Sequence, residues 1–134
     1  MDKSYLAGFF DADGYITASR NKESEERKIV CGFTNTNKEL LDLMQKYIEK
    51  TFKIKSYYGM QKKRKESHKT PFDLRIQGPN VVKLLTQLPI KHSKKVKRLI
   101  IAVEIQKCTI RNGKYKEDQL QYRRMLCEKL LNTL

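Results

Sequence analysis

Two aspartates lie one residue apart near the start of the chain, at the end of an apolar stretch. The stretch LAGFFDADG runs from Leu6 to Gly14 and places carboxylates at Asp11 and Asp13. We predict a helix over residues 3–12, and a helix C-terminus carries partial negative charge, so each carboxylate there is unfavourable by roughly 0.3–1 kcal/mol. A divalent cation would reverse that cost, and the free carbonyls of the last turn could add ligands. An Asp-Gly turn is the alternative; it explains Asp13 but not Asp11.

The same helix carries small residues on one side. Gly8 and Ala12 are one turn apart, and Ala7 lies beside them. Small side chains at this spacing let a second helix approach closely, which is a reason to accept a helix-weakening glycine. The pattern therefore predicts a helix–helix contact, either with another molecule or as an ordinary tight crossing within the fold.

The elements that must position these residues follow from the hydrophobic pattern. After the helix capped by Asp2, alternation of Ile16 and Ala18 predicts a strand with these two side chains inward. Thr36 and Glu39 form a capping box before a helix with Leu40, Leu43, Met44, Tyr47 and Ile48 on one face. The predicted strands are 14–20, 28–34, 53–60 and 72–77, and the later helices are 79–88, 93–106 and 116–134, the last burying Leu120, Met125 or Leu126, Leu130 and Leu134.

The composition indicates one domain with a polyanionic partner. The 134 residues carry 29 basic and 15 acidic side chains, a formal charge of +14. A charge of this size favours nucleic acid over membrane, although a ribosome-associated or merely soluble basic protein is the alternative. The longest apolar stretch, LIIAV, is too short to span a bilayer. Three distant cysteines with no zinc spacing predict reduced thiols in an intracellular compartment and no secretion.

LAGFFDADG resembles the LAGLIDADG motif of homing endonucleases at every position except the two central apolar ones. The αββαββ order after the motif is similar to that family too. The resemblance implies an α+β fold, αββαββα, with an antiparallel saddle-shaped sheet and helices on one face. It also implies a homodimer that cuts double-stranded DNA at a long near-palindromic site with Mg²⁺ or Mn²⁺ and no small-molecule cofactor. The alternatives are an RNA maturase or non-cleaving DNA-binding protein on the same scaffold, or a generic basic nucleic-acid-binding protein.

The resemblance assigns roles to residues of the site. Asp13 would bind the metal, with the Ala12 carbonyl beside it, and Ala7, Gly8, Asp11 and Ala12 would form the dimer interface. Asn37 would orient water; the alternative is that it only begins the second helix. A lysine of the segment 91–97 would stabilise developing charge, and we favour Lys94 or Lys95.

The strands would contact DNA, because alternation turns one face of the sheet away from the helices. Arginine and glutamine on such a face suit guanine and adenine edges. The loop after the third strand would grip phosphates through Lys62, Lys63, Arg64 and Lys65, unless it is only a solvated charged loop. The candidate contacts on the strands are Thr17, Ser19, Thr34, Asn35, Lys53, Lys55, Tyr57, Arg75 and Gln77.

Overall fold

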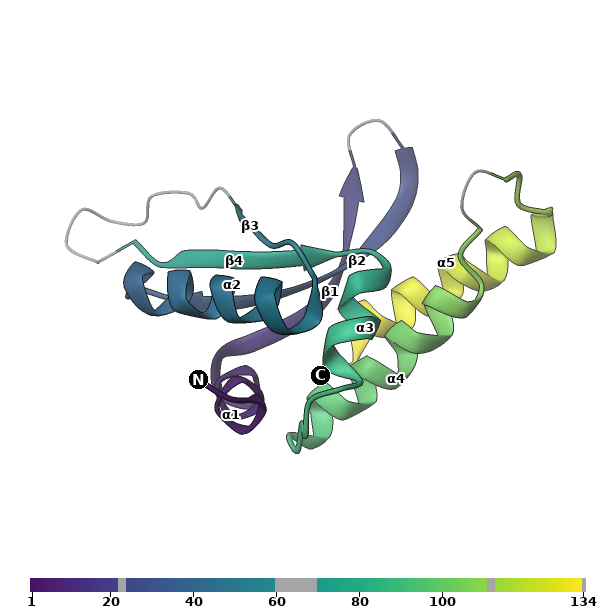
Figure 1. Cartoon of the computed structure of the whole chain (residues 1–134). Coiled ribbons are helices and arrows are strands. Elements are labelled where there is room, and N and C mark those ends of the chain that lie inside the picture. Colours follow the sequence, from purple (N-terminus) through teal and green to yellow (C-terminus); the bar gives the residue numbers. More distant parts are fainter. Residues whose placement is uncertain (22–23, 60–69, 111–112, 134) are drawn as a thin grey trace.

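The computed structural model describes residues 1–21, 24–59, 70–110 and 113–133. The chain folds as α+β in the predicted αββαββα order, and two further helices follow the seventh element of that order (Figure 1). No helix in these ranges is both long enough and apolar enough to cross a bilayer. The elements are α1 (Lys3–Asp13), β1 (Gly14–Asn21), β2 (Ser24–Asn35), α2 (Lys38–Phe52), β3 (Tyr57–Gly59), β4 (Phe72–Gln77), α3 (Pro79–Leu85), α4 (Ser93–Lys107) and α5 (Glu117–Asn132).

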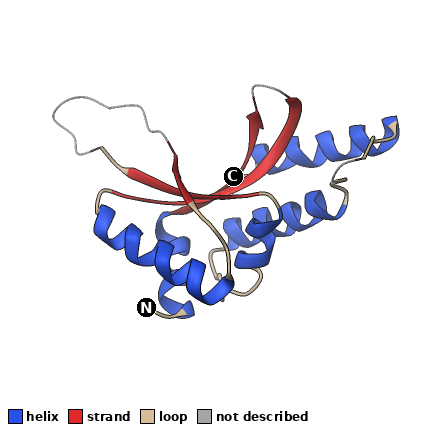
Figure 2. Ribbon diagram, turned by 45° about the horizontal axis from the view of Figure 1, so that its top comes forward, coloured by secondary structure: helices blue, strands red, loops and turns tan. Residues whose placement is uncertain are grey.

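The four strands form one antiparallel sheet in the order β1-β2-β4-β3. The helices lie on one side of this sheet, and the other side is left uncovered (Figure 2). Gly14 pairs with Phe33, so the start of β1 and the end of β2 lie at the same end of the sheet. The C-terminus of α1 therefore opens directly onto the sheet.

The core fills the space between the sheet and the helices. Alternation directs Ile16 and Ala18 inward as predicted, and Leu74 and Ile76 of β4 do the same. The ring of Phe10 from α1 packs edge-on against an inward aromatic of β2. Burying side chains of this size stabilises the fold by roughly 1.5–3 kcal/mol each. The outward positions are consequently free to be polar.

Two predicted strands have different bounds in the structure. β2 begins at Ser24 and not at residue 28 as predicted, because the polar residues before Lys28 continue the pairing with β1. The strand predicted over 53–60 is only Tyr57–Gly59. Lys53 adopts the left-handed conformation with φ 59° as the C-cap of α2, and the buried Ile54 then anchors a loop.

The predicted capping box at the start of α2 is wrong. Asn37 is the N-cap, and its side chain accepts a hydrogen bond from the Leu40 amide at 3.1 Å. The Asn35 side chain accepts from the Asn37 amide at 2.8 Å, which moves the helix start one residue along. The buried face consequently uses Leu41, whereas Leu43 is 58% exposed.

The later helices differ less from expectation. α3 ends at Leu85, three residues before the predicted end, although Pro79 opens it as predicted. In α5, Leu126 and Leu130 are buried, and Met125 is exposed. Leu134 lies outside the described residues.

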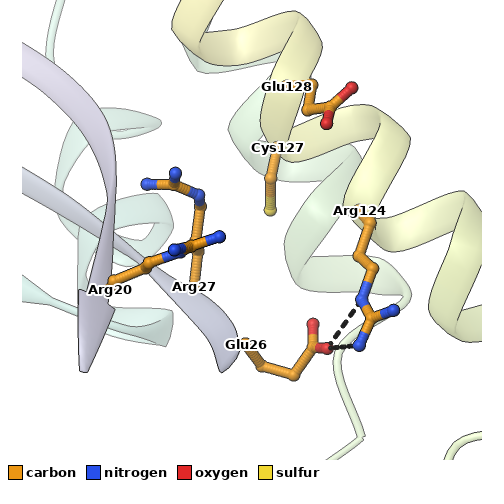
Figure 3. Close-up of a pocket in the computed structure, with 6 residues that line it drawn as sticks. All are labelled: Arg20, Glu26, Arg27, Arg124, Cys127 and Glu128. Carbon is orange, nitrogen blue, oxygen red and sulfur yellow. Dashed lines mark hydrogen bonds and ion pairs between the residues drawn. The ribbon is translucent and has the colours of Figure 1, made fainter. Parts of the chain in front are cut away.

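Helix α5 braces the hairpin formed by β1 and β2. Arg123, only 4% exposed, donates to the Arg27 carbonyl at 2.6 Å and to the Thr109 hydroxyl at 3.1 Å. Glu26 of β2 forms ion pairs with both Arg123 and Arg124. A cavity of about 240 Å³ lies beside this contact, lined by Arg20, Glu26, Arg27, Arg124, Cys127 and Glu128 (Figure 3).

Candidate functional site

The C-terminus of α1 and the N-terminus of α4 cap each other. The Lys95 ammonium donates to the carbonyls of Phe10 at 2.8 Å and Asp11 at 2.6 Å. The Asp11 carboxylate accepts from the backbone amides of Lys91 at 3.0 Å and His92 at 3.1 Å, directly before α4. Each side chain thus opposes the partial charge of the helix end that it contacts. A lysine therefore does sit at the negative end of α1, supplied from another helix.

Burial lowers the pKa of Lys95, and the negative charges of Asp11 and Asp13 oppose that shift. The ammonium also lies over the Phe10 ring, 5.7 Å from its centroid. Lys95 is thus held in place by two carbonyls and an aromatic face, which is the environment of a structural cation.

Asp13 is the last residue of α1, and its side chain is exposed, as is that of Ala12. The two bonds from Lys95 do not use the Ala12 carbonyl. Asp13 and Ala12 therefore offer a carboxylate and a carbonyl oxygen, the ligand types that Mg²⁺ prefers. In the described part of the chain no cluster of three or more His, Cys, Asp or Glu could hold a metal. The donor types fit a divalent cation, but one chain supplies too few of them to enclose it.

A cationic cavity of about 260 Å³ adjoins this end of α1. It is lined by Gly14, Tyr15, Ile16, His92, Lys94, Lys95 and Arg98. Arg98 donates to the carbonyls of Ile16 at 2.9 Å and Thr133 at 2.8 Å, so it fixes α4 against β1 and the C-terminal end of α5. Lys94 is exposed at the cavity. Of the two lysines predicted, Lys94 is the one whose ammonium faces solvent beside Gly14.

Asn37 lies at the same end of the sheet, two residues after β2. Its side chain caps α2, so the alternative interpretation, a residue that begins the helix, describes its observed contact. Its role in orienting water stays a prediction.

The predicted DNA contacts do not all lie on the same surface. Thr17, Thr34 and Arg75 alternate with core residues and lie on the uncovered face, as do Ser19, Tyr57 and Gln77. Three others do not lie on that face of a strand. Asn35 caps the turn into α2, Lys53 ends that helix, and Lys55 lies in the loop after it. Lys62, Lys63, Arg64 and Lys65 lie outside the described residues.

Sequence reasoning missed the centre of this uncovered face. Asp73 is only 1% exposed, and its carboxylate accepts from the Tyr15 hydroxyl at 2.7 Å and from Nε of Arg75 at 2.6 Å. The Thr34 hydroxyl donates to its other oxygen at 3.4 Å. The sequence did contain a signal for this cluster, because Asp73 occupies an outward position of a predicted strand two residues before Arg75.

The exposed side of α1 is narrower than predicted. Gly8 is exposed, and a Cβ built on it would meet nothing within 4 Å. Ala12 is exposed one turn later. Ala7, in contrast, is 2% exposed and belongs to the core, so its assignment to an intermolecular face is not supported.

Comparisons with known proteins agree with this fold. A family model described as a LAGLIDADG-like domain matches residues 1–89. The crystal structure of the LAGLIDADG meganuclease I-AabMI bound to uncleaved DNA superimposes with a TM-score of 0.69 at 18% identity, covering 95% of this chain and 44% of that one. A double mutant of I-SmaMI gives 0.56 at 15% identity, with 95% and 44% covered. The LAGLIDADG meganuclease I-CpaMI bound to uncleaved DNA gives 0.51 at 16% identity, with 97% and 52% covered.

The open antiparallel sheet and its single-sided helices define a fold of the LAGLIDADG meganuclease type. The chain belongs to the LAGLIDADG homing endonuclease family. It spans about half the length of the solved structures that it matches. A comparison with curated proteins gave no match.

Proposed function

We propose that the protein is a homodimeric, metal-dependent endonuclease that cuts double-stranded DNA at a long near-palindromic site. The observation that carries the proposal is the position of Asp13. Its carboxylate is exposed at the end of α1, directly before the sheet begins at Gly14. An acidic residue held there, in a chain of net charge +14, suits a cation that also contacts a phosphate.

The uncovered face is the proposed DNA-binding surface. Polar side chains occupy the outward positions of β1 and β4, among them Thr17, Ser19, Arg75 and Gln77. A two-stranded antiparallel ribbon fits the major groove. Two of the structurally similar meganucleases are bound to uncleaved DNA. Their likeness supports the same partner for this chain.

The second copy would pack against α1. Gly8 and Ala12 leave open space on the exposed side of this helix, so another copy of α1 could approach backbone to backbone. Asp11 keeps its bonds to the start of α4 and would border that contact. Two Asp13 carboxylates would then meet near the axis, one for each strand of DNA.

Asp13 and the Ala12 carbonyl would hold Mg²⁺ or Mn²⁺ together with a phosphate oxygen and water. The bound cation would supply Lewis-acid stabilisation of the phosphate and a more acidic water. Lys94 would place its charge beside the attacked phosphate from the cavity next to Gly14. Asn37 would orient water from the start of α2.

The experiment is to incubate the protein with a library of duplexes in Mg²⁺ and to sequence the cleaved ends, with Ca²⁺ as the condition for binding. One recurrent cut site is expected with wild type. Asp13→Asn should lower cleavage by several orders of magnitude, since a neutral amide holds the cation poorly. Its Tm and its binding in Ca²⁺ should stay near those of wild type.

Asp11→Asn is the matched control, because it makes the same change two residues away at a carboxylate bonded to α4. It should lower Tm more than Asp13→Asn does. Cleavage by Asp13→Asn at the wild-type rate, or loss of its fold in place of its activity, would contradict the catalytic assignment.

A further inference from the structure

The uncovered face of the sheet has an ordered centre. The strand register places Tyr15, Gly32, Arg75 and Tyr57 in one row across the four strands. Asp73 lies in the adjacent row, opposite Thr34 and Gly59. Tyr15 and Arg75 both lean diagonally out of their own row to reach Asp73.

Two glycines make these diagonal paths possible. A Cβ on Gly32 would lie 2.4 Å from the ring of Tyr15, and a Cβ on Gly59 would lie 2.3 Å from Nε of Arg75. Tyr15 therefore crosses the backbone of β2 to reach β4, and Arg75 lies against the backbone of Gly59 at the end of β3. A side chain at either glycine would occupy the space that Tyr15 or Arg75 now fills.

Asp73 is too buried to contact DNA itself. It is 1% exposed, and three donors already occupy its two oxygens. Burial and the hydrogen bond to Asp73 raise the pKa of the Tyr15 hydroxyl, so this residue stays a neutral donor. The charge of Arg75 balances that of Asp73, which makes the pair a neutral unit in the middle of a basic protein.

The bond to Asp73 uses Nε of Arg75 and leaves the two terminal nitrogens at the far edge of the guanidinium. These nitrogens present two parallel N–H donors. In the major groove only guanine offers two acceptors, N7 and O6, on one base edge, whereas adenine and cytosine present a donor there and thymine a methyl group beside its acceptor. A guanidinium fixed through Nε is therefore suited to one base.

We propose that Asp73 is a positioning residue that fixes Arg75 to read a guanine in each half of the target. This inference rests on the proposed binding of DNA by the uncovered face. Tyr15 and Thr34 hold the carboxylate, the carboxylate holds the guanidinium plane, and the guanidinium reads the base. The aspartate thereby sets specificity at a base that it does not touch.

The test is selection from a randomised duplex library in Ca²⁺, followed by sequencing of bound DNA. Wild type should enrich a motif with guanine at one position of each half-site, preferred about tenfold or more over other bases. Arg75→Lys keeps the charge but loses the planar fork and the Nε donor that binds Asp73, so the guanine preference should fall several-fold at that position alone. Asp73→Asn should shrink the same preference several-fold while the rest of the motif is retained.

Asp42→Asn is the matched control, because Asp42 also accepts a tyrosine hydroxyl but lies on α2, on the helical side of the sheet. It should leave the guanine preference intact. Loss of folding would weaken binding to every sequence, whereas a misdirected guanidinium changes the preference at one position, so the two effects are separable.

Three results would overturn the inference. If Arg75→Lys changes the base preference at no position of the motif, Arg75 does not contact a guanine. The proposal that the uncovered face binds DNA would be unaffected by this result. A preference that depends on Arg75 but not on Asp73 would remove the positioning role. Selection that enriches no motif with wild type would overturn the sequence-specific binding on which both proposals rest.

Discussion

At the scale of single residues, the two aspartates of α1 have different surroundings. Asp11 faces the positive end of α4, where it binds two backbone amides, so its place in the fold is stabilising without any metal. Asp13 is exposed and lies near Lys95, whose ammonium contacts carbonyls of the same helix end. The sequence placed both carboxylates at the negative end of a helix, where they are unfavourable. For Asp11, hydrogen bonds to two backbone amides of another segment offset that cost, whereas the Asp13 carboxylate is left exposed.

Lys95 should be needed for stability. Lys95→Met keeps the length of the side chain but removes two charge-assisted bonds to α1, which should lower the free energy of unfolding by about 1–3 kcal/mol. Lys94→Met is the control one residue away and should change it by less than about 0.5 kcal/mol, as surface substitutions do. Urea denaturation of both variants measures the difference. Equal stability of the two variants would contradict the capping role.

The sequence predicted the aspartates and narrowed the lysine to a short segment, but not its contact. Lys95 meets carbonyls 84 and 85 residues away in the chain. Neighbouring lysines have similar local sequence, and only the phase of α4 against α1 separates Lys95 from Lys94. Asp73 was missed for a related reason, because its three donors come from two other strands and from its own.

At the scale of elements, α5 holds the β1–β2 hairpin through one buried cation. Arg123→Met should lower the free energy of unfolding by about 2–4 kcal/mol, since it removes the donor to the part-buried Arg27 carbonyl and one of the ion pairs of Glu26. Arg124→Met is the control, because Arg124 pairs with the same glutamate from an exposed position and should cost about 1 kcal/mol or less. Chemical denaturation tests the difference.

Hydrogen exchange gives the second measurement for α5. Amides of β1 and β2 that exchange faster in Arg123→Met, with β4 unchanged, would locate the loss at the hairpin. If exchange in Arg123→Met is faster by the same factor in all four strands, α5 supports the whole core and not this hairpin in particular.

The hydrogen bond that joins Tyr58 of β3 to Asp42 of α2 should make the stability of the fold depend on pH. The hydrogen bond from Tyr58, and then that from Lys38, lowers the pKa of Asp42 below its ordinary value. A lowered folded-state pKa adds stability above the unfolded-state pKa, and that stability is lost as the pH falls through the folded-state value. Tyr58→Phe should raise the pKa of Asp42. The free energy of unfolding should then fall less steeply as the pH is lowered. An NMR titration of the Asp42 carboxyl that is unchanged in this variant would contradict the link.

Elements were predicted well where the hydrophobic period was clear and poorly at their ends. α4 and β4 match their predicted ranges to within one residue, because each carries an unbroken pattern. The start of α2 failed because TNTNKE offers several competing caps, and Asn35 decides among them by bonding the Asn37 amide. The start of β3 was predicted too early because Lys53 adopts a left-handed conformation and turns the chain, whereas the sequence pattern there is that of a strand.

At the scale of the whole molecule, assembly depends on the exposed side of α1. Gly8→Leu should place a branched side chain in the open space beside this helix without disturbing the fold of one chain, since nothing lies within 4 Å of the new Cβ. The variant should sediment as a monomer at micromolar concentration and should neither bind tightly nor cut. Its Tm, extrapolated to low concentration, should match that of wild type.

Two results would contradict the dimer. Wild type that sediments as a monomer and still cuts its site is one of them. The other is a Gly8→Leu variant that sediments as a dimer, since the copies would then meet through another surface.

The interlocked cluster at the centre of the uncovered face constrains how the target sequence of this protein can change during evolution. Tyr15, Asp73 and Arg75 depend on one another and on two clearing glycines, so a change at any one of them disturbs the rest. Thr17 and Gln77 lie further along the strands, outside the bonds to Asp73. During divergence, new target sequences should therefore be acquired first at the outer positions of each half-site, while the base read from the centre is inherited. A laboratory retargeting effort would meet the same order of difficulty.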